Sequence, residues 1–258
     1  PAYDQSVQGV SGVMSVTGRD GEGPLRAGYP VADTVGGLTA AMAICAALNA
    51  TPRGCVIDVS MLEATLATMG WAISNHLIAG AAPRQNGNDN PTSAPSGTFR
   101  VADGYINIAA NRDTQWESLA RHLGREDLLN DPDFATREDR KTNRLRLTVE
   151  LETVLVTQST AHWVAALNAL GVPTGEVMSV PDILAHPQIA ERHFLAHFND
   201  VPGVPGGATV VRAGARIDGA PLTVEAPPPV LGADTDMILK TLGLSADDLA
   251  RLRADQVI

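Results

Sequence analysis

A single carboxylate, Asp33, stands just before a long run of small apolar residues. In a dry site a carboxylate can act as a nucleophile on an activated carbonyl, provided that amide donors stabilise the oxyanion. Gly36 and Gly37 follow three and four residues later and would let other atoms approach the backbone closely. The competing interpretation is a helix N-cap, where Asp is favoured for structural reasons alone. The residues by themselves favour the cap, and the two roles can coexist.

Three other patterns suggest chemistry but have more ordinary explanations. His193 and His197 are four apart on an expected helix, but no convincing third ligand accompanies them, so we expect no metal site. The three glycines between residues 18 and 23 follow no strand and do not form a dinucleotide fingerprint. Residues 137–146 carry charges of both signs, which predicts a solvated helical face.

The elements around Asp33 are expected to be a helix, a turn, a strand and a second helix. Residues 38–48 are small and apolar on nearly every side, which predicts a helix buried all round. Residues 55–59 are typical of a buried strand. Ser60 and Glu63 have capping-box spacing and predict a helix that runs towards His76. This succession indicates an α/β layered domain.

A second unit is expected after a long loop without apolar periodicity. Its pattern is a hairpin, several helices and a tail with one strand and two short helices, typical of a small α+β domain. The expected ranges are 80–97 for the loop, 99–101 and 105–109 for the hairpin, a helix from Thr114, helices over 145–156 and 160–170, a strand at 208–212, and tail helices over 234–242 and 245–253.

Composition limits the partners and the compartment. A formal net charge of -10 over 258 residues argues against a nucleic-acid partner. The 2 cysteines, Cys45 and Cys55, have apolar neighbours and are expected to be buried thiols in a reducing compartment, the cytoplasm. No membrane-spanning segment and no signal peptide are expected. Because the chain opens at Pro1 without a methionine, we expect an amino-terminal part to be missing or to lie on another chain.

Several different short motifs follow one another along the chain in a characteristic order. They are Pro1-Ala2-Tyr3-Asp4 with Ser11-Gly12, Pro30-Val31-Ala32-Asp33 with Gly37, Gly54 with Ile57-Asp58-Val59-Ser60, Ala94-Pro95-Ser96-Gly97-Thr98-Phe99, Asp103-Gly104, Asn111 with Gln115-Trp116, Gly171-Val172-Pro173, His186-Pro187-Gln188 with Arg192, and Pro229-Val230-Leu231-Gly232. This ordered set resembles the family III CoA-transferases, which include the formyl-CoA and carnitine CoA-transferases. No single motif is decisive, but together they extend over essentially the whole chain.

The resemblance implies an α/β fold with a Rossmann-like large domain, whose amino-terminal part would precede Pro1, and a small α+β domain. Residues 1–70 would be the remainder of the large domain and 71–95 a linker. Residues 96–195 would form the small domain, and 196–258 a linker and carboxy-terminal segment that returns to the large domain. The resemblance also implies an interlocked homodimer, in which each chain threads through the other.

The resemblance further implies that Asp33 is the nucleophile of a CoA-transferase. CoA would pass from an acyl-CoA to an acceptor carboxylic acid through a mixed anhydride and an aspartyl-CoA thioester, with no permanently bound cofactor. Tyr3 and Asp4 fall where the family lines the CoA site, although an ordinary strand end explains them equally well. The residues implied at the CoA site are Pro1, Ala2, Tyr3, Asp4, Gly87, Asn88, Asp89 and Asn90.

The segment 87–90 departs from the family pattern. Some members carry a run of glycines here that closes over the active aspartate, and this chain lacks the run. A plain linker is therefore the alternative to a lid.

Three other functions compete with transfer of CoA. An acyl-CoA racemase of the same fold would use a histidine where this chain has Tyr3, and a phenol with an ordinary pKa near ~10 is a poor base at neutral pH. A non-catalytic homologue is disfavoured by the presence of Asp33. An acyl-CoA hydrolase would differ only in letting water reach the anhydride.

Overall fold

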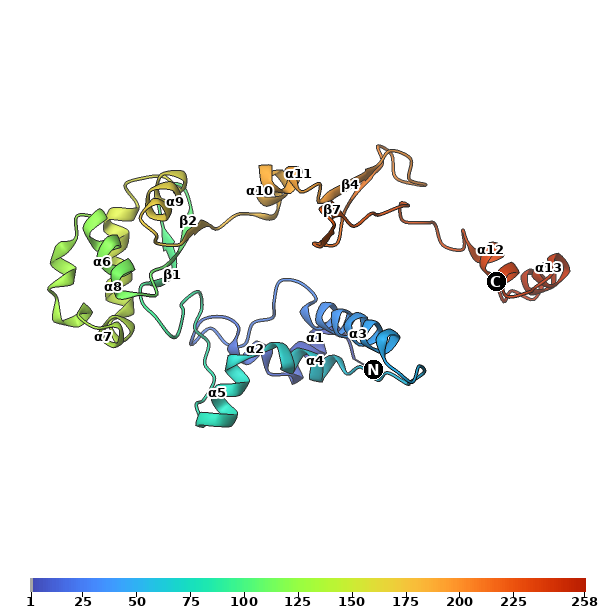
Figure 1. The fold of residues 1–258 in the computed structure, drawn as a ribbon, viewed down its shortest axis with the longest axis horizontal. Coiled ribbons are helices and arrows are strands. Elements are labelled where there is room, and N and C mark those ends of the chain that lie inside the picture. Colours follow the sequence, from blue (N-terminus) through green and yellow to red (C-terminus); the bar gives the residue numbers. More distant parts are fainter. Residues whose placement is uncertain (1) are drawn as a thin grey trace. The chain divides into compact units, whose positions relative to one another are not determined.

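The computed structural model describes residues 2–258, and the chain divides into two compact units, Pro1–Val177 and Met178–Ile258 (Figure 1). Helices and short antiparallel sheets occur in both units, in keeping with the predicted α/β class. The four-part domain division stays a prediction. The helices of the first unit are α1 (Asp4–Val10), α2 (Val13–Val16), α3 (Val31–Asn49), α4 (Met61–Thr68), α5 (Trp71–Ala79), α6 (Asp113–His122), α7 (Arg137–Thr142), α8 (Arg144–Leu155) and α9 (Thr160–Ala169), with 3-10 turns η1 (Glu126–Leu129) and η2 (Pro132–Phe134).

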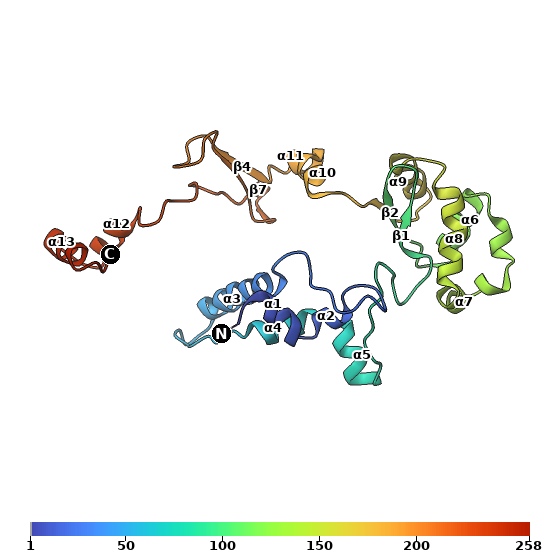
Figure 2. The ribbon, with the colours of Figure 1, turned by 180° about the vertical axis from the view of Figure 1, so that it is seen from behind.

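Helices α1, α3 and α4 lie side by side and form the part of the first unit that carries Asp33 (Figures 1 and 2). Gly36 of α3 allows the close approach to α4, because a methyl group there would lie 3.2 Å from Cγ of Met61. The predicted cap of α4 is confirmed, since Oγ of Ser60 accepts the Glu63 amide at 3.2 Å. The helix predicted to continue to His76 is interrupted at Gly70, whose φ of 49° is in the left-handed region.

The predicted strand at residues 55–59 is wrong. These residues form no strand, and Val56 is 97% exposed. A strand exists only when a neighbouring strand accepts and donates its backbone hydrogen bonds. Among residues 2–95 the structure describes no strand, so the β-forming composition of this segment has nothing to pair with.

Helix α3 is less buried than its composition predicted. Ala32 and Gly36 are its buried residues, whereas Leu38 and Met42 are 67% and 68% exposed. Cys45 and Cys55 are exposed as well, so the prediction of buried thiols is also wrong. The physical reason is that the extensive packing on α3 comes from α1 and α4, which cover one side of it.

In length and composition α3 also meets the requirement for crossing a membrane, the one helix among residues 2–258 that does. The expectation that the chain holds no such segment is therefore wrong by this criterion. The core helix of a soluble protein can satisfy the same criterion.

The second half of this unit is built around a three-stranded antiparallel sheet in the order β1 (Ser96–Arg100), β2 (Tyr105–Ala109), β3 (Thr174–Glu176). The predicted hairpin is confirmed, with Phe99 opposite Ile106. Alternation along β2 buries Ile106 and Ile108 and leaves Tyr105 exposed, so one face of the sheet meets the helices. The core between them contains Ala94, Phe99, Val101, Ile106, Ile108, Ala110, Trp116, Leu119, Ala120, Leu123, Leu128, Phe134, Leu147, Leu151, Leu155, Trp163, Leu167 and Val172.

A carboxylate from the hairpin turn fixes the start of α9. Oδ1 of Asp103 accepts both the amide and the hydroxyl of Thr160 at 2.7 Å. These bonds, above all the one from the Thr160 hydroxyl, lower the pKa of Asp103 below its ordinary value. The cap thus ties a helix to the sheet that it covers.

The second unit, Met178–Ile258, has smaller elements. A two-stranded sheet pairs β4 (Leu195–Phe198) with β5 (Ala208–Val211), which confirms the strand predicted near 208–212. The two predicted tail helices are confirmed as α12 (Thr235–Thr241) and α13 (Ala246–Ala254). The remaining elements are α10 (Val180–Ala185), α11 (Pro187–Glu191), β6 (Arg216–Ile217) and β7 (Ala220–Pro221).

We expect Leu151→Ala to lower the free energy of unfolding by about 3 kcal/mol, because it removes a fully buried side chain and leaves a cavity. Val149→Ala, on the same helix but at a position that is 64% exposed, should change it by less than about 0.5 kcal/mol. Urea unfolding followed by tryptophan fluorescence measures both. If Leu151→Ala lowered the free energy of unfolding by no more than about 0.5 kcal/mol, like Val149→Ala, the buried side chains of α8 would not support this unit.

Candidate functional site

Asp33 is the third residue of α3 and is exposed in its first turn. The N-cap position is held by Pro30, without a side-chain cap bond, so the interpretation of Asp33 as the cap is wrong. A negative charge in the first turn is favoured by the helix dipole, which concentrates positive potential at this end. The Asp33 side chain is thus exposed to solvent at the start of a long helix.

The carboxylate that does cap α3 is Asp4, which comes from α1. Its Oδ1 accepts the amide of Ala32 at 2.9 Å, and its Oδ2 accepts Nε2 of Gln8 at 2.7 Å. The predicted residues Asp4 and Asp33 are therefore brought together at one helix end. Because α1 begins at Asp4, the alternative of a strand end at Tyr3 and Asp4 is wrong.

The residues that precede Asp4 are also predicted to lie near the CoA site. Tyr3 is the N-cap of α1 and is 83% exposed, and Ala2 is exposed beside it. Pro1 lies outside the described residues. Ala2 and Tyr3 are thus available to a ligand, while both oxygens of Asp4 already accept hydrogen bonds.

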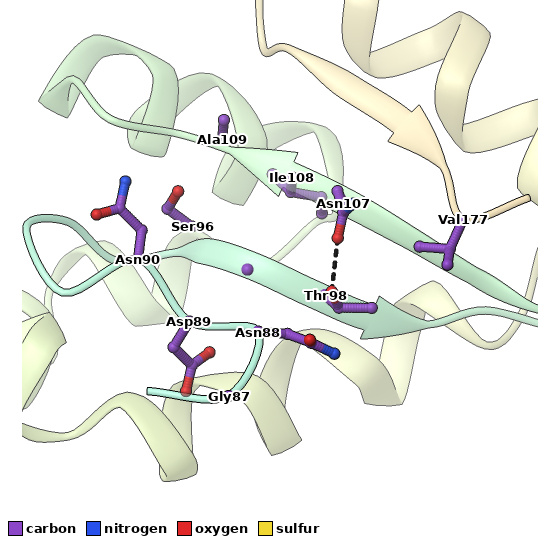
Figure 3. A pocket seen from close by; sticks show the side chains of 11 residues that line it. Gly87, Asn88, Asp89, Asn90, Ser96, Thr98, Asn107, Ile108, Ala109 and Val177 are labelled. Carbon is purple, nitrogen blue, oxygen red and sulfur yellow. Dashed lines mark hydrogen bonds between the residues drawn. The ribbon is translucent and has the colours of Figure 1, made fainter. Parts of the chain in front are cut away.

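The segment 87–90 borders a hollow of about 490 Å³ on the open face of the sheet (Figure 3). Thr98 and Asn107 form part of its floor and are joined by a 2.5 Å hydrogen bond between Oγ1 and Oδ1. Gly97 allows the segment to approach the sheet closely, because a methyl group there would lie 3.2 Å from the Asn88 carbonyl and 2.8 Å from Oδ1 of Asp89. The sheet therefore has a helix-covered face and a face that leaves room for a ligand.

A second cleft, of about 460 Å³, connects the same segment to α3. Gly87 and Asp89 line it together with Val31 and Val35, the residues two before and two after Asp33, and with Trp71 of α5. Asp33 is not among its lining residues. The structure thus brings the helix of Asp33 and the segment 87–90 to one cleft, without placing the Asp33 side chain in it.

Hydrogen bonds anchor the approach to the segment 87–90. Nε2 of Gln85 donates to the carbonyls of Thr17 and Gly23 at 2.6 and 2.7 Å, and the Gly87 amide donates to the Gly18 carbonyl at 2.8 Å. The glycines near residue 18 therefore hold a neighbouring loop. A plain linker would not need these contacts, and the lid role stays a prediction.

Arg144 fixes the other end of this segment. Its guanidinium donates to the carbonyls of Asn90, Ser93 and Ser96 at 2.5, 2.8 and 3.1 Å, and lies 3.6 Å from Oδ1 of Asp89. One side chain thereby donates to three backbone oxygens between residue 90 and the start of β1.

Arg140, four residues earlier in the sequence and on α7, acts in the same way. It is 1% exposed, and its guanidinium donates to the carbonyls of Ala94 and Phe134 and to Asp113 at 2.9, 3.1 and 2.5 Å. The prediction of a solvated face over 137–146 is therefore wrong at Arg140 and Arg144. A signal was present: neither arginine has an acidic residue three or four positions away, whereas Lys141 has Glu138.

His193 and His197 do not share a helix. His193 has a φ of 49° and lies outside any helix, and His197 lies in β4, where its Nδ1 is 2.9 Å from Oγ1 of Thr209. The helix expected for them is wrong. Within the described part of the chain no group of three metal-ligating side chains is found.

The sequence matches CoA-transferase family III over residues 1–235. The chain belongs to this family. It is 36% identical to the acetyl-CoA:oxalate CoA-transferase of Acetobacter aceti over 80% of its length and 54% of that protein. It is 31% identical to the succinate–glutarate CoA-transferase of Agrobacterium fabrum over 93% of its length and 60% of that protein. The chain thus spans somewhat over half the length of these relatives.

Two solved structures share the fold of this chain. A CAIB/BAIF family protein from Brucella suis has a TM-score of 0.79 and 32% identity, covering 93% of this chain and 63% of that chain. Rv3272 from Mycobacterium tuberculosis has a TM-score of 0.76 and 26% identity, covering 92% and 63%. The α/β fold is therefore that of a family III CoA-transferase.

We expect Arg140→Ala to lower the free energy of unfolding by about 3 kcal/mol, because two carbonyls and a carboxylate lose their donor. Arg121→Ala is the matched control, since its pair with Glu117 is exposed and contributes about 0.5 kcal/mol or less. Denaturant titration of both variants measures the difference. Similar stabilities would mean that the Arg140 bonds are replaced by water at no cost.

Proposed function

We propose that this chain carries the nucleophile of a CoA-transferase, and that the nucleophile is Asp33. The observation that supports this most is that the Asp33 side chain is exposed and makes no cap bond, in a chain that belongs to the CoA-transferase family. Asp33 lies in the first turn of α3, while a different carboxylate, Asp4, satisfies the helix end. Asp33 is therefore not consumed by a structural role and is free to react.

The proposed reaction preserves the thioester energy in acyl bonds. The Asp33 carboxylate attacks the thioester carbonyl of an acyl-CoA and expels the CoA thiolate, which leaves a mixed anhydride. The thiolate then attacks the anhydride carbonyl on the Asp33 side, which forms an aspartyl-CoA thioester and releases the first acid. An acceptor carboxylate reverses the two steps, so that Asp33 is regenerated and a new acyl-CoA leaves.

Both steps require an ionised nucleophile and little water. Attack uses the carboxylate form, which is the normal state of an aspartate at neutral pH, and the dipole of α3 favours that charge. Water would hydrolyse the anhydride, so the site must be covered during the reaction. We assign this cover to the segment 87–90, and contacts with CoA to Ala2 and Tyr3.

Names of several relatives favour a small dicarboxylic acid as acceptor or donor. They mention oxalate, glutarate and D-citramalate, each of which carries two carboxyl groups. We therefore propose that the acid exchanged by the protein that carries this chain is a dicarboxylic acid. Two exposed free thiols, Cys45 and Cys55, agree with a reducing, cytoplasmic compartment.

The exposed side of α3 supports a further assignment. Large apolar side chains such as Leu38, Met42 and Leu48 would be costly to leave in water. We propose that these apolar side chains are covered by a segment that lies outside residues 1–258 and by a second copy of the chain, in an interlocked homodimer. A single copy would then not be a stable folded unit.

Asp33→Ala should abolish CoA transfer, with a loss of several orders of magnitude in kcat, because no covalent intermediate can form. Asp247→Ala removes an exposed acid from the first turn of α13 and should leave kcat unchanged. Steady-state assays with an acyl-CoA and a dicarboxylate measure both. Turnover near the wild-type rate in Asp33→Ala would end the proposed mechanism.

Incubation with an acyl-CoA and no acceptor should add the mass of CoA less water to the peptide that contains Asp33. Without an added acceptor the only acid present is the one released by the donor, at no more than the enzyme concentration, so the thioester should persist while water is excluded. Mass spectrometry of digested enzyme detects it. An unmodified Asp33 together with rapid exchange of the substrate α-proton into deuterated water would instead identify a racemase.

A further inference from the structure

The start of α3 lacks a cap from its own sequence. Helices begin with amides that have no partner within the helix, and an N-cap side chain normally accepts one of them. Here the N-cap is Pro30, which has no polar side chain, and no side-chain cap bond comes from it. The amide of Ala32, the residue directly before Asp33, is instead satisfied by Oδ1 of Asp4 at 2.9 Å.

A buried glutamine fixes Asp4 in turn. Gln8 is fully buried, one turn after Asp4 on α1, and its Nε2 donates to Oδ2 of Asp4 at 2.7 Å. Its Oε1 accepts the amide of Ala27 at 2.9 Å, and its Nε2 also lies 3.4 Å from the carbonyl of Tyr29. The pair therefore holds both the first turn of α3 and the chain that leads into it.

We infer that Asp4 is a positioning residue for Asp33, an inference that rests on the proposed function of Asp33 as nucleophile. The first turn of a helix is the part that frays, and Asp33 is in this turn of α3. Asp4 holds the backbone of the adjacent residue, so it restricts the directions in which the Asp33 carboxylate can point. A displacement of about 1 Å at a reacting group can cost on the order of 10²-fold in rate.

The geometry argues against the alternative that Asp4 contacts CoA. Each of its carboxylate oxygens already accepts a hydrogen bond from the protein, and the residue is half-buried. Its negative charge would also oppose the phosphates of CoA. A CoA ligand would have to break the cap in order to reach Asp4.

The test compares two aspartates with the same structural task. Asp4→Ala removes the acceptor of an amide at the start of α3, and Asp103→Ala removes the acceptor of an amide at the start of α9, at 2.9 and 2.7 Å respectively. The measured quantity is the single-turnover rate of CoA adduct formation on Asp33, together with KM for the acyl-CoA. Comparable thermal shifts in both variants would match them for stability.

We expect Asp4→Ala to slow adduct formation by at least about tenfold with KM changed by less than about threefold, since removal of a positioning contact affects the chemical step. Asp103→Ala should remain within about threefold of the wild-type rate. Equal rates in the two variants would overturn the inference. A rise in KM without a change in the adduct rate would overturn it too, because it would make Asp4 a CoA contact.

A paired exchange keeps the inference testable if Asp4→Ala does not fold. Gln8→Glu alone sets two carboxylates against each other, whereas Asp4→Asn with Gln8→Glu restores a donor opposite an acceptor and keeps acceptors for Ala32 and Ala27. The double variant should form adduct at least about tenfold faster than Gln8→Glu alone. Rates that are equal in the two would contradict the inference.

Failure of the inference is distinguishable from failure of the proposed function. If Asp33→Ala loses activity while Asp4→Ala matches Asp103→Ala, Asp33 is the nucleophile and Asp4 does not position it. If Asp33→Ala retains activity, the proposed function is wrong and the positioning role falls with it.

Discussion

Backbone groups at helix starts and in loops must find a hydrogen-bond partner when they leave water, and at three places in this chain a charged side chain from another element provides it. Asp4 accepts the Ala32 amide, Asp103 accepts the Thr160 amide, and Arg144 donates to the carbonyls of Asn90, Ser93 and Ser96. Each bond joins elements that are far apart in sequence. These contacts, together with apolar packing, hold α3, the sheet and the loop between them in place.

The sheet and helix α3 differ in how completely their apolar side chains are buried. Around the sheet, the core is closed and its large side chains, such as Phe134 and Leu151, are fully buried. Around α3, burial is confined to the side that faces α1 and α4, and the remaining apolar side chains are exposed. The family relatives are longer than this chain, which agrees with the proposal that further protein covers α3. A covalent carboxylate mechanism needs such a cover, because its intermediates react with water.

Local elements were the most predictable part of the fold. The hairpin at β1 and β2, the helix α8 and the Ser60 cap were confirmed, since each depends on neighbours within a few residues. The strand at 55–59 was wrong because pairing requires a second strand that local composition does not supply. For the site, the position of Asp33 near a helix start could be predicted. Its cap could not, because Asp4 is distant in sequence and belongs to another helix.

The sequence by itself determined the family, through ordered motifs across residues 1–235, and the approximate boundaries of α8, α9, α12 and α13, through apolar spacing. Tertiary structure alone decided the roles of the charged side chains. Arg140 is in a run that looks solvated, yet it is buried against the carbonyls of Ala94 and Phe134. Asp4 looks like a ligand contact and Asp33 like a cap, yet Asp4 makes the cap bond. Charge and residue type are local properties, whereas the partner of a hydrogen bond is set by how distant segments pack.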